Sequence, residues 1–256
     1  MRAMHTESIA YDCAGTRNVG YLAVDDARSG ARPGVLICPE GNGLHKEAKA
    51  RANRLAERGY IAFAVDYVGE GRVLTEMSEM MTRLGVLRAD LDSTRALGNR
   101  ALDVLLARPE VDRAKVAAIG YCFGGQLALE MARGGAPLAC VVGFHSMLST
   151  TRPEDAANIR GKVLACIGAE DPMIPPEQRL AFEQEMRAAK VDWRLHLHGN
   201  AVHGFANPDA GHWGNPAVQY HEPSHQRSWR AMLDLFDETF GPTQDSLQRA
   251  HERLEP

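Results

Sequence analysis

The stretch that decides the fold reads Val116-Ala-Ala-Ile-Gly-Tyr-Cys-Phe-Gly-Gly-Gln-Leu-Ala-Leu-Glu-Met-Ala132. Its apolar start, 116–119, predicts a short buried β-strand, and residues 126–132 are good helix formers. Cys122 lies between them. A residue on a sharp strand-to-helix turn needs almost no side chain two positions before and after it, which Gly120 and Gly124 provide. We therefore expect a strand, a strained turn that presents Cys122, and a helix.

The same alternation of strands and helices extends on both sides of this stretch. Apolar or alternating runs predict seven more strands at 7–12, 17–24, 35–38, 61–65, 138–142, 163–167 and 193–197. Helices are predicted at 46–58, 80–107, 175–189 and across 229–240, and the polar tail 243–256 fits either a docked helix or a frayed end. This order predicts an α/β fold with a mostly parallel sheet of about eight strands, an N-terminal antiparallel hairpin and helices on both faces.

Composition narrows the class of protein. A chain of 256 residues with a formal net charge of −4 predicts one domain, 1–256, and no basic surface for nucleic acid. No apolar run approaches the roughly 20 residues of a membrane span, and the N-terminus lacks a signal peptide pattern. The five cysteines include no C-x-x-C pair, which argues against disulfide and zinc-thiolate frameworks. We expect a cytoplasmic protein with reduced thiols; its oligomeric state stays open.

Two residues downstream of Cys122 complete a pattern for nucleophilic catalysis. Asp171 follows the strand predicted at 163–167, and His203 follows the strand predicted at 193–197. The chain order nucleophile, acid, histidine is that of a catalytic triad at the carboxyl ends of parallel strands. His203 would take the thiol proton and return it to the leaving group, while Asp171 would orient the imidazole. Glu170 is the rival acid.

Acyl transfer also requires hydrogen-bond donors for the oxyanion that forms. The backbone N–H of Phe123, directly after Cys122, is one candidate. The second is Gly41, in the loop Pro39-Glu-Gly-Asn-Gly43 after the strand predicted at 35–38. Cys122 itself would begin a helix, whose N-terminal dipole favours a thiolate.

With these motifs in place, the sequence resembles the dienelactone hydrolases (carboxymethylenebutenolidases) of the α/β-hydrolase superfamily. The matching segments are 35–41, 57–66, 120–125, 168–175 and 202–205. The resemblance implies hydrolysis of a small ester or lactone through an acyl-enzyme on Cys122, without a cofactor. It also implies that Glu40 holds the cysteine's proton at rest, until substrate binding frees the thiolate.

One departure from the family pattern bears on the substrate. Dienelactone hydrolases bind the substrate's carboxylate with arginines, one of them four residues after the triad histidine. Here that position is Asn207, which cannot replace the charge, although Arg83 or Arg88 could compensate. The segments 69–83 and 207–219 are predicted to be irregular loops that form the pocket rim. Strand ends and loops supply further candidates for pocket residues, which are Tyr67, His145, Trp213 and Tyr220.

Two other interpretations compete with a cysteine hydrolase. Cys122 could be a redox-sensing or ligand-capturing thiol on a catalytically idle hydrolase scaffold, because fold alone does not establish activity. A metal-dependent hydrolase is suggested by the histidines at positions 196, 198, 212, 221 and 225. No H-E-x-x-H pattern or convergent carboxylate set accompanies those histidines, so the sequence predicts no metal site.

Overall fold

The computed structural model describes residues 4–242, and the tail considered above as a docked or frayed end lies outside them. One eight-stranded sheet runs through the molecule in the order β1-β2-β4-β3-β5-β6-β7-β8. Strands β3 to β8 are parallel, while β1 and β2 form an antiparallel hairpin whose second strand pairs antiparallel with β4. The predicted sheet and hairpin are confirmed. The strand bounds are β1 Met4–Cys13, β2 Thr16–Asp25, β3 Arg32–Cys38, β4 Ile61–Ala64, β5 Val111–Tyr121, β6 Cys140–Phe144, β7 Lys162–Gly168 and β8 Trp193–His198.

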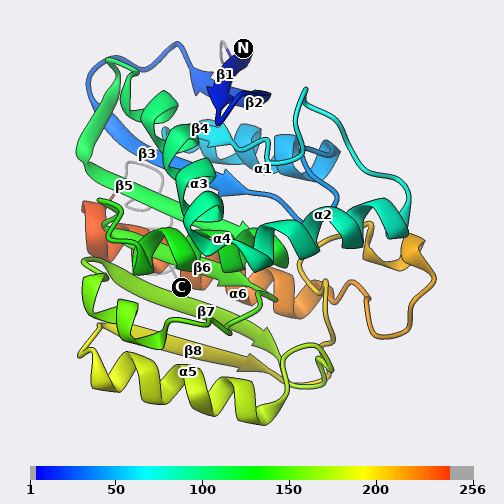
Figure 1. The fold of residues 1–256 in the computed structure, drawn as a ribbon. Helices are drawn as coiled ribbons and strands as arrows, with labels where there is room; N and C mark the ends of the chain where they lie inside the picture. Colours follow the sequence, from blue (N-terminus) through cyan, green and yellow to red (C-terminus); the bar gives the residue numbers. More distant parts are fainter. Residues whose placement is uncertain (1–3, 243–256) are drawn as a thin grey trace, which may run out of the picture.

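Helices cover the sheet on both faces (Figure 1). The helices α2 Met77–Ala89, α3 Leu91–Leu106, α4 Phe123–Arg133 and α5 Pro176–Ala188 lie in front of the sheet, and α1 Lys46–Ala56 and α6 Glu222–Phe240 lie behind it. Two short 3₁₀ helices, η1 Pro153–Asn158 and η2 Ala210–Trp213, lie in the connections.

The central strands are apolar throughout because both of their faces are buried. In β5, Val116 and Ala118 join the core under α3 and α4, whereas Ala117 and Ile119 join the core under α1 and α6. Successive side chains of a strand point to opposite faces, so each strand contributes to both cores. This explains why these strands read as continuous apolar runs rather than as an alternation.

One predicted helix is in fact two. The stretch expected at 80–107 divides at Asp90, which has extended backbone angles and caps α3, accepting hydrogen bonds from the backbone N–H of Ser93 (3.0 Å) and from its hydroxyl (2.6 Å). Helix α2 starts at Met77, so the end of the segment 69–83, predicted to be irregular, is helical. As a result, α2 lies at an angle to α3, across the carboxyl ends of the strands (Figure 1).

None of the helices between residues 4 and 242 is both long and apolar enough to cross a lipid bilayer.

Candidate active site

The turn between β5 and α4 holds Cys122 in a strained conformation. Its φ is 54° and its ψ is −119°, a region that residues with a side chain rarely adopt. A Cβ on Gly120 would lie 2.1 Å from the carbonyl oxygen of Gly124, and a Cβ on Gly124 would lie 2.0 Å from the carbonyl oxygen of Cys38. Both glycines are therefore sterically required, as the sequence predicted. The turn keeps Cys122 partly exposed, where it lines a cavity.

His203 and Asp171 meet beside this cysteine. Asp171 lies on the loop between β7 and α5, and His203 lies on the loop between β8 and α6. The Nδ1 of His203 donates a hydrogen bond to Oδ2 of Asp171 at 2.8 Å, and both side chains are buried. Glu170, the rival acid, points to solvent and is exposed. Asp171 is thus the carboxylate that can orient the imidazole.

The electrostatics of the group favour a thiolate–imidazolium pair. Burial by itself raises the pKa of Cys122, but the His203 side chain and the N–H of Phe123 lower it below its ordinary value. Burial lowers the pKa of His203, but the Cys122 thiolate and Asp171 raise it to about 10. The other ring nitrogen of His203, Nε2, is buried and has no hydrogen-bond partner of regular geometry within residues 4–242. That nitrogen is free to exchange a proton with the sulfur or with a bound substrate.

The two predicted oxyanion donors lie at the same end of the sheet. The N–H of Phe123 is directed to the sulfur of Cys122 at the start of α4. Gly41 lines the cavity, and no residue within 4–242 accepts a hydrogen bond from its N–H. A Cβ on Gly41 would lie 2.9 Å from Leu84 Cδ1, so a larger residue would require the Leu84 side chain on α2 to shift. This arrangement leaves the Gly41 N–H available for a ligand.

Glu40 lies at the edge of the cavity but is bonded away from the cysteine. Arg51 holds both of its carboxylate oxygens at 2.7 Å, and Nε2 of His45 lies 2.8 Å from Oε2. Burial by itself raises the pKa of Glu40, but Arg51 and His45 lower it well below its ordinary value. Neither Arg51 nor His45 was predicted to lie in the site. For Arg51 the sequence held only a weak signal, which is that its helical phase is close to that of the buried residues Ala48, Ala52 and Leu55 of α1.

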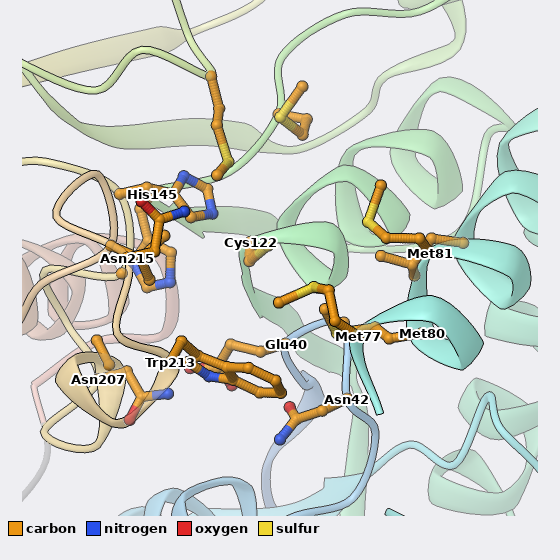
Figure 2. Close-up of a pocket in the computed structure, with 18 of the residues that line it drawn as sticks. Glu40, Asn42, Met77, Met80, Met81, Cys122, His145, Asn207, Trp213 and Asn215 are labelled. Atoms are coloured by element: carbon orange, nitrogen blue, oxygen red, sulfur yellow. The ribbon is translucent and has the colours of Figure 1, made fainter. Parts of the chain in front are cut away.

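The cavity in front of Cys122 has a volume of about 460 Å³. Figure 2 shows Cys122 at its back, with methionines of α2 on one side and His145 and Asn215 on the other. The predicted pocket residues His145, Asn207 and Trp213 all line it. Most of the wall is apolar, contributed by Met77, Met80, Met81, Leu84, Met147, Met173, Trp213 and Val218. Both segments expected at the rim, 69–83 and 207–219, contribute to this wall.

Two predicted pocket residues do not line the cavity. Tyr67 is fully buried behind it, where its hydroxyl donates to the carbonyl oxygen of Glu40 and accepts from the N–H of Gly43. Although Tyr67 follows a strand end, its side chain packs against the loop that contains Glu40 and Gly43 and does not reach the cavity. Tyr220 lies outside the cavity, with its hydroxyl 3.2 Å from Nδ1 of His225.

The two arginines considered as carboxylate ligands have different surroundings. Arg83 donates twice to the carbonyl oxygen of Tyr67, at 3.0 and 2.6 Å, and does not line the cavity. Arg88 does line it, and its Nε donates to Oε1 of Gln126 at 3.2 Å. Asn207 uses its side-chain oxygen to accept the N–H of Asp209 (2.9 Å). Arg88 is therefore the guanidinium within reach of a ligand.

His145 is an unexpected neighbour of the predicted triad. Its imidazole packs edge-on against that of His203, with ring centroids 5.1 Å apart, and its backbone φ is 39°. Burial and the nearby charge of His203 lower its pKa well below the ordinary value, so the ring is neutral. Within residues 4–242 neither of its ring nitrogens has a hydrogen-bond partner.

No metal donors converge here. In the part of the chain that the structure describes, no three or more His, Cys, Asp or Glu side chains are grouped so that they could hold a metal ion. All five cysteines are free thiols.

Comparison with known proteins shows the family to which the chain belongs. The model of the dienelactone hydrolase family matches residues 19–240. A relative from Yersinia pestis, named "Putative carboxymethylenebutenolidase", is 28% identical over 235 residues, which cover 84% of this chain and 82% of the relative. The solved structure named m3DLH shares 45% identity with a TM-score of 0.90, covering 93% of this chain and 99% of that one.

A second solved structure is a dienelactone hydrolase-like promiscuous phosphotriesterase from metagenomic libraries. It shares 42% identity with a TM-score of 0.89, and the match covers 93% of this chain and 99% of that one. Because the family model spans most of the sequence, the chain belongs to the dienelactone hydrolase family and is a hydrolase of ester or lactone bonds with the predicted α/β-hydrolase fold.

Proposed function

We propose that the chain hydrolyses small, neutral carboxylic esters or lactones through an acyl-enzyme on Cys122, with His203 and Asp171 completing the triad. The observation that carries this proposal is the buried 2.8 Å hydrogen bond between His203 and Asp171, next to a strained cysteine at the back of an apolar cavity. A cysteine that only fills space in the core requires neither an imidazole nor a carboxylate beside it.

The residues have defined roles in this reaction. The sulfur of Cys122 attacks the carbonyl carbon, and the oxyanion accepts hydrogen bonds from the N–H groups of Phe123 and Gly41. As the carbon–oxygen bond to the leaving group breaks, Nε2 of His203 gives its proton to the departing alkoxide. His203 then removes a proton from a water molecule that attacks the thioester, and the acid product leaves as the sulfur is released. Asp171 keeps the imidazole in the orientation that both proton transfers need.

The cavity favours substrates without a charge on their acyl or alcohol group. Five methionines and Trp213 supply most of the wall, and these side chains adapt to apolar groups of varied shape. Asn207 brings no charge to the position where the family has an arginine. Arg88 is the only guanidinium or ammonium group on the wall within residues 4–242, so an anionic substrate would have one candidate partner rather than a pair.

The test is a panel of aryl esters and lactones, with and without a carboxylate, assayed with the wild-type protein, Cys122→Ala and Cys13→Ala. Cys13 is a half-buried thiol on β1 and serves as the matched control. We expect turnover of neutral esters, lost in Cys122→Ala and kept in Cys13→Ala. Turnover that survives in Cys122→Ala would refute the triad. A strong preference for the anionic substrates would refute the neutral substrate class and point to Arg88.

The panel should also include a neutral aryl phosphotriester. A structure that shares 42% identity with this chain is described as a promiscuous phosphotriesterase, and a neutral triester suits an apolar cavity. Attack by the same sulfur on phosphorus would expel the aryl oxide, which takes a proton from His203, and would place a negative oxygen at the same pair of N–H donors. Water activated by His203 would then displace the sulfur and release the phosphodiester. Loss of this activity in Cys122→Ala, in parallel with ester turnover, would assign both reactions to one site.

The interpretation as an idle scaffold with a redox-sensing thiol makes the opposite prediction. In that case Cys122 reacts with peroxide while no ester or lactone in the panel is turned over. The Asp171–His203 hydrogen bond argues against it, because a sensor thiol requires a lowered pKa but no oriented base.

A further inference from the structure

We propose that Arg51, together with His45, locks Glu40 as a carboxylate that cannot accept the cysteine's proton, so that Cys122 is already a thiolate in the free protein. The inference rests on the proposed function only for the choice of Cys122 as the nucleophile. It differs from the role that the family resemblance implied for Glu40, in which that residue holds the proton until substrate arrives.

The first support is that every oxygen of the Glu40 carboxylate is occupied. Nη1 of Arg51 donates to Oε2 and Nη2 donates to Oε1, both at 2.7 Å. The third donor is His45. Its Nδ1 accepts the N–H of Glu47 (3.3 Å), so its Nε2 carries the proton that is donated to Oε2 at 2.8 Å. A carboxylate with three donors strongly prefers its charged form.

The second support is that Arg51 is fixed in place by the site itself. The side chains of Arg51 and Glu40 are only 7% and 10% exposed. The guanidinium stacks on the ring of Tyr121, 3.4 Å from its centroid, and Tyr121 directly precedes the nucleophile. It also reaches the carbonyl oxygen of Ala206 at 3.3 Å, on the loop that carries His203. One cation therefore connects the glutamate loop, the cysteine turn and the histidine loop.

The third support is where the cysteine's proton can go. Glu40 makes no hydrogen bond to Cys122, whereas His203 has a buried nitrogen, Nε2, without another partner in residues 4–242. The pKa directions agree, because those of Cys122 and Glu40 are lowered and that of His203 is raised. The titratable and charged groups that face this cluster from the surrounding elements are His45, Arg51, Tyr67, Tyr121, His145, Asp171, His203 and His225.

A consequence concerns substrate choice. If Glu40 is neutralised by Arg51 on α1, thiolate formation needs no carboxylate from the substrate. Arg51 does not line the cavity, so a bound substrate cannot draw it away from Glu40. Arg51 is then a positioning residue that acts on the nucleophile through Glu40, and neutral substrates are sufficient.

The test measures the thiol in the absence of any substrate. The rate of alkylation of Cys122 by iodoacetamide, a neutral reagent, is followed against pH in a background of Cys13→Ala. In the wild type we expect the midpoint to lie at least one pH unit below the ordinary cysteine value of about 8.5. Arg51→Met leaves Glu40 as a poorly compensated anion near the sulfur, so the midpoint should rise by about one unit or more, a roughly tenfold slower alkylation on the acid side.

The double variant Glu40→Gln/Arg51→Met separates an electrostatic role from a structural one. If Arg51 acts through the charge of Glu40, removing that charge as well returns the midpoint to the wild-type value or below it. Arg51→Lys, which keeps the positive charge, should lie closer to the wild type than Arg51→Met does. Arg54→Met is the matched control on the same helix, because Arg54 stacks on Trp229 instead, and its midpoint should not move. Circular dichroism checks that each variant is folded.

Two results would overturn the inference. The first is a wild-type midpoint at or above the ordinary value, which would mean that the free protein holds a thiol. The second is a double variant that stays shifted like Arg51→Met, which would mean that Arg51 acts without Glu40. Both results are pH midpoints of alkylation, and measuring them requires no ester turnover. A protein that alkylates as expected but cleaves no ester would therefore refute the proposed function and leave this inference standing.

Discussion

Replacing Gly124 by alanine tests whether the cysteine turn is built as tightly as the structure indicates. The new Cβ would lie 2.0 Å from the carbonyl oxygen of Cys38 and 2.3 Å from that of Pro39. Ordinary van der Waals separation is about 3.5 Å, so the two segments must move apart by about 1.5 Å. The obstacle is backbone, which cannot rotate away as a side chain can. We therefore expect a destabilisation near the upper end of the overpacking range, about 3 kcal/mol.

The same movement should disturb catalysis, because Cys38 and Pro39 lead directly into Glu40 and Gly41. A displacement of about 1 Å at a reacting group costs roughly 10²-fold, and the loss of one oxyanion donor costs about 10²- to 10³-fold in kcat. We expect kcat for a neutral aryl ester to fall by about 10²-fold or more, with a smaller change in KM.

Urea unfolding followed by tryptophan fluorescence measures the free energy of unfolding, and initial rates measure kcat and KM. Gly199→Ala is the matched control, since no heavy atom lies within 4 Å of its added Cβ and its φ is not positive. A Gly124→Ala protein with the stability and kcat of Gly199→Ala would show that the turn is not close-packed against β3, and the reasoning would fail.

Four further outcomes follow from the site. Asp171→Asn should lower kcat by about 10³- to 10⁴-fold in an assay with a neutral aryl ester, because the amide no longer favours the productive form of His203, while Glu170→Gln should match the wild type. A profile of kcat/KM against pH should fall as the pH rises above about 10, where His203 loses the proton that it donates to the leaving group. The stability that comes from the raised pKa of His203 is complete below its unfolded pKa of about 6.5 and is lost as the pH rises from there through about 10. Trp213→Ala should raise KM for a naphthyl ester more than for an acetate of a small alcohol, with kcat nearly unchanged, and an equal effect on both would remove Trp213 from the substrate's surroundings. Incubation with a chelator should leave ester turnover unchanged, since each proposed step uses only side chains, backbone N–H groups and water.

The sheet could be predicted because its signals are local. A strand covered on both faces must be apolar at every position, and the runs at 35–38, 116–119 and 163–167 are each explained by a core on either side. The glycines around Cys122 could be predicted for a similar reason, because the collisions that require them arise within the turn and at the adjoining end of β3. Asp171 and His203 could be predicted to lie near Cys122 because the carboxyl ends of parallel strands lie at the same edge of a sheet.

The partners of Glu40 could not be predicted in the same way. Arg51 contacts Glu40 only because α1 packs behind the glutamate loop, and the helical period alone makes Arg51 look like an ordinary charge near the edge of the buried stripe. The division at Asp90 was missed because an aspartate in a helical pattern fits the solvent side as well as an N-cap. Tyr67 was misplaced because position at a strand end does not say whether a side chain turns into the cavity or under the neighbouring loop.

The origin of the cavity wall has a consequence for how this protein could diversify. The reacting groups lie on the turn and loops that follow strands, whereas α2 supplies three of the methionines that would touch a substrate. Helix α2 packs against α3, and it contributes no group to the proposed proton transfers. Exchanging residues 77–89 for the corresponding helix of a relative should therefore transplant the relative's preference for acyl groups, with the rate of the chemical step inherited from the recipient.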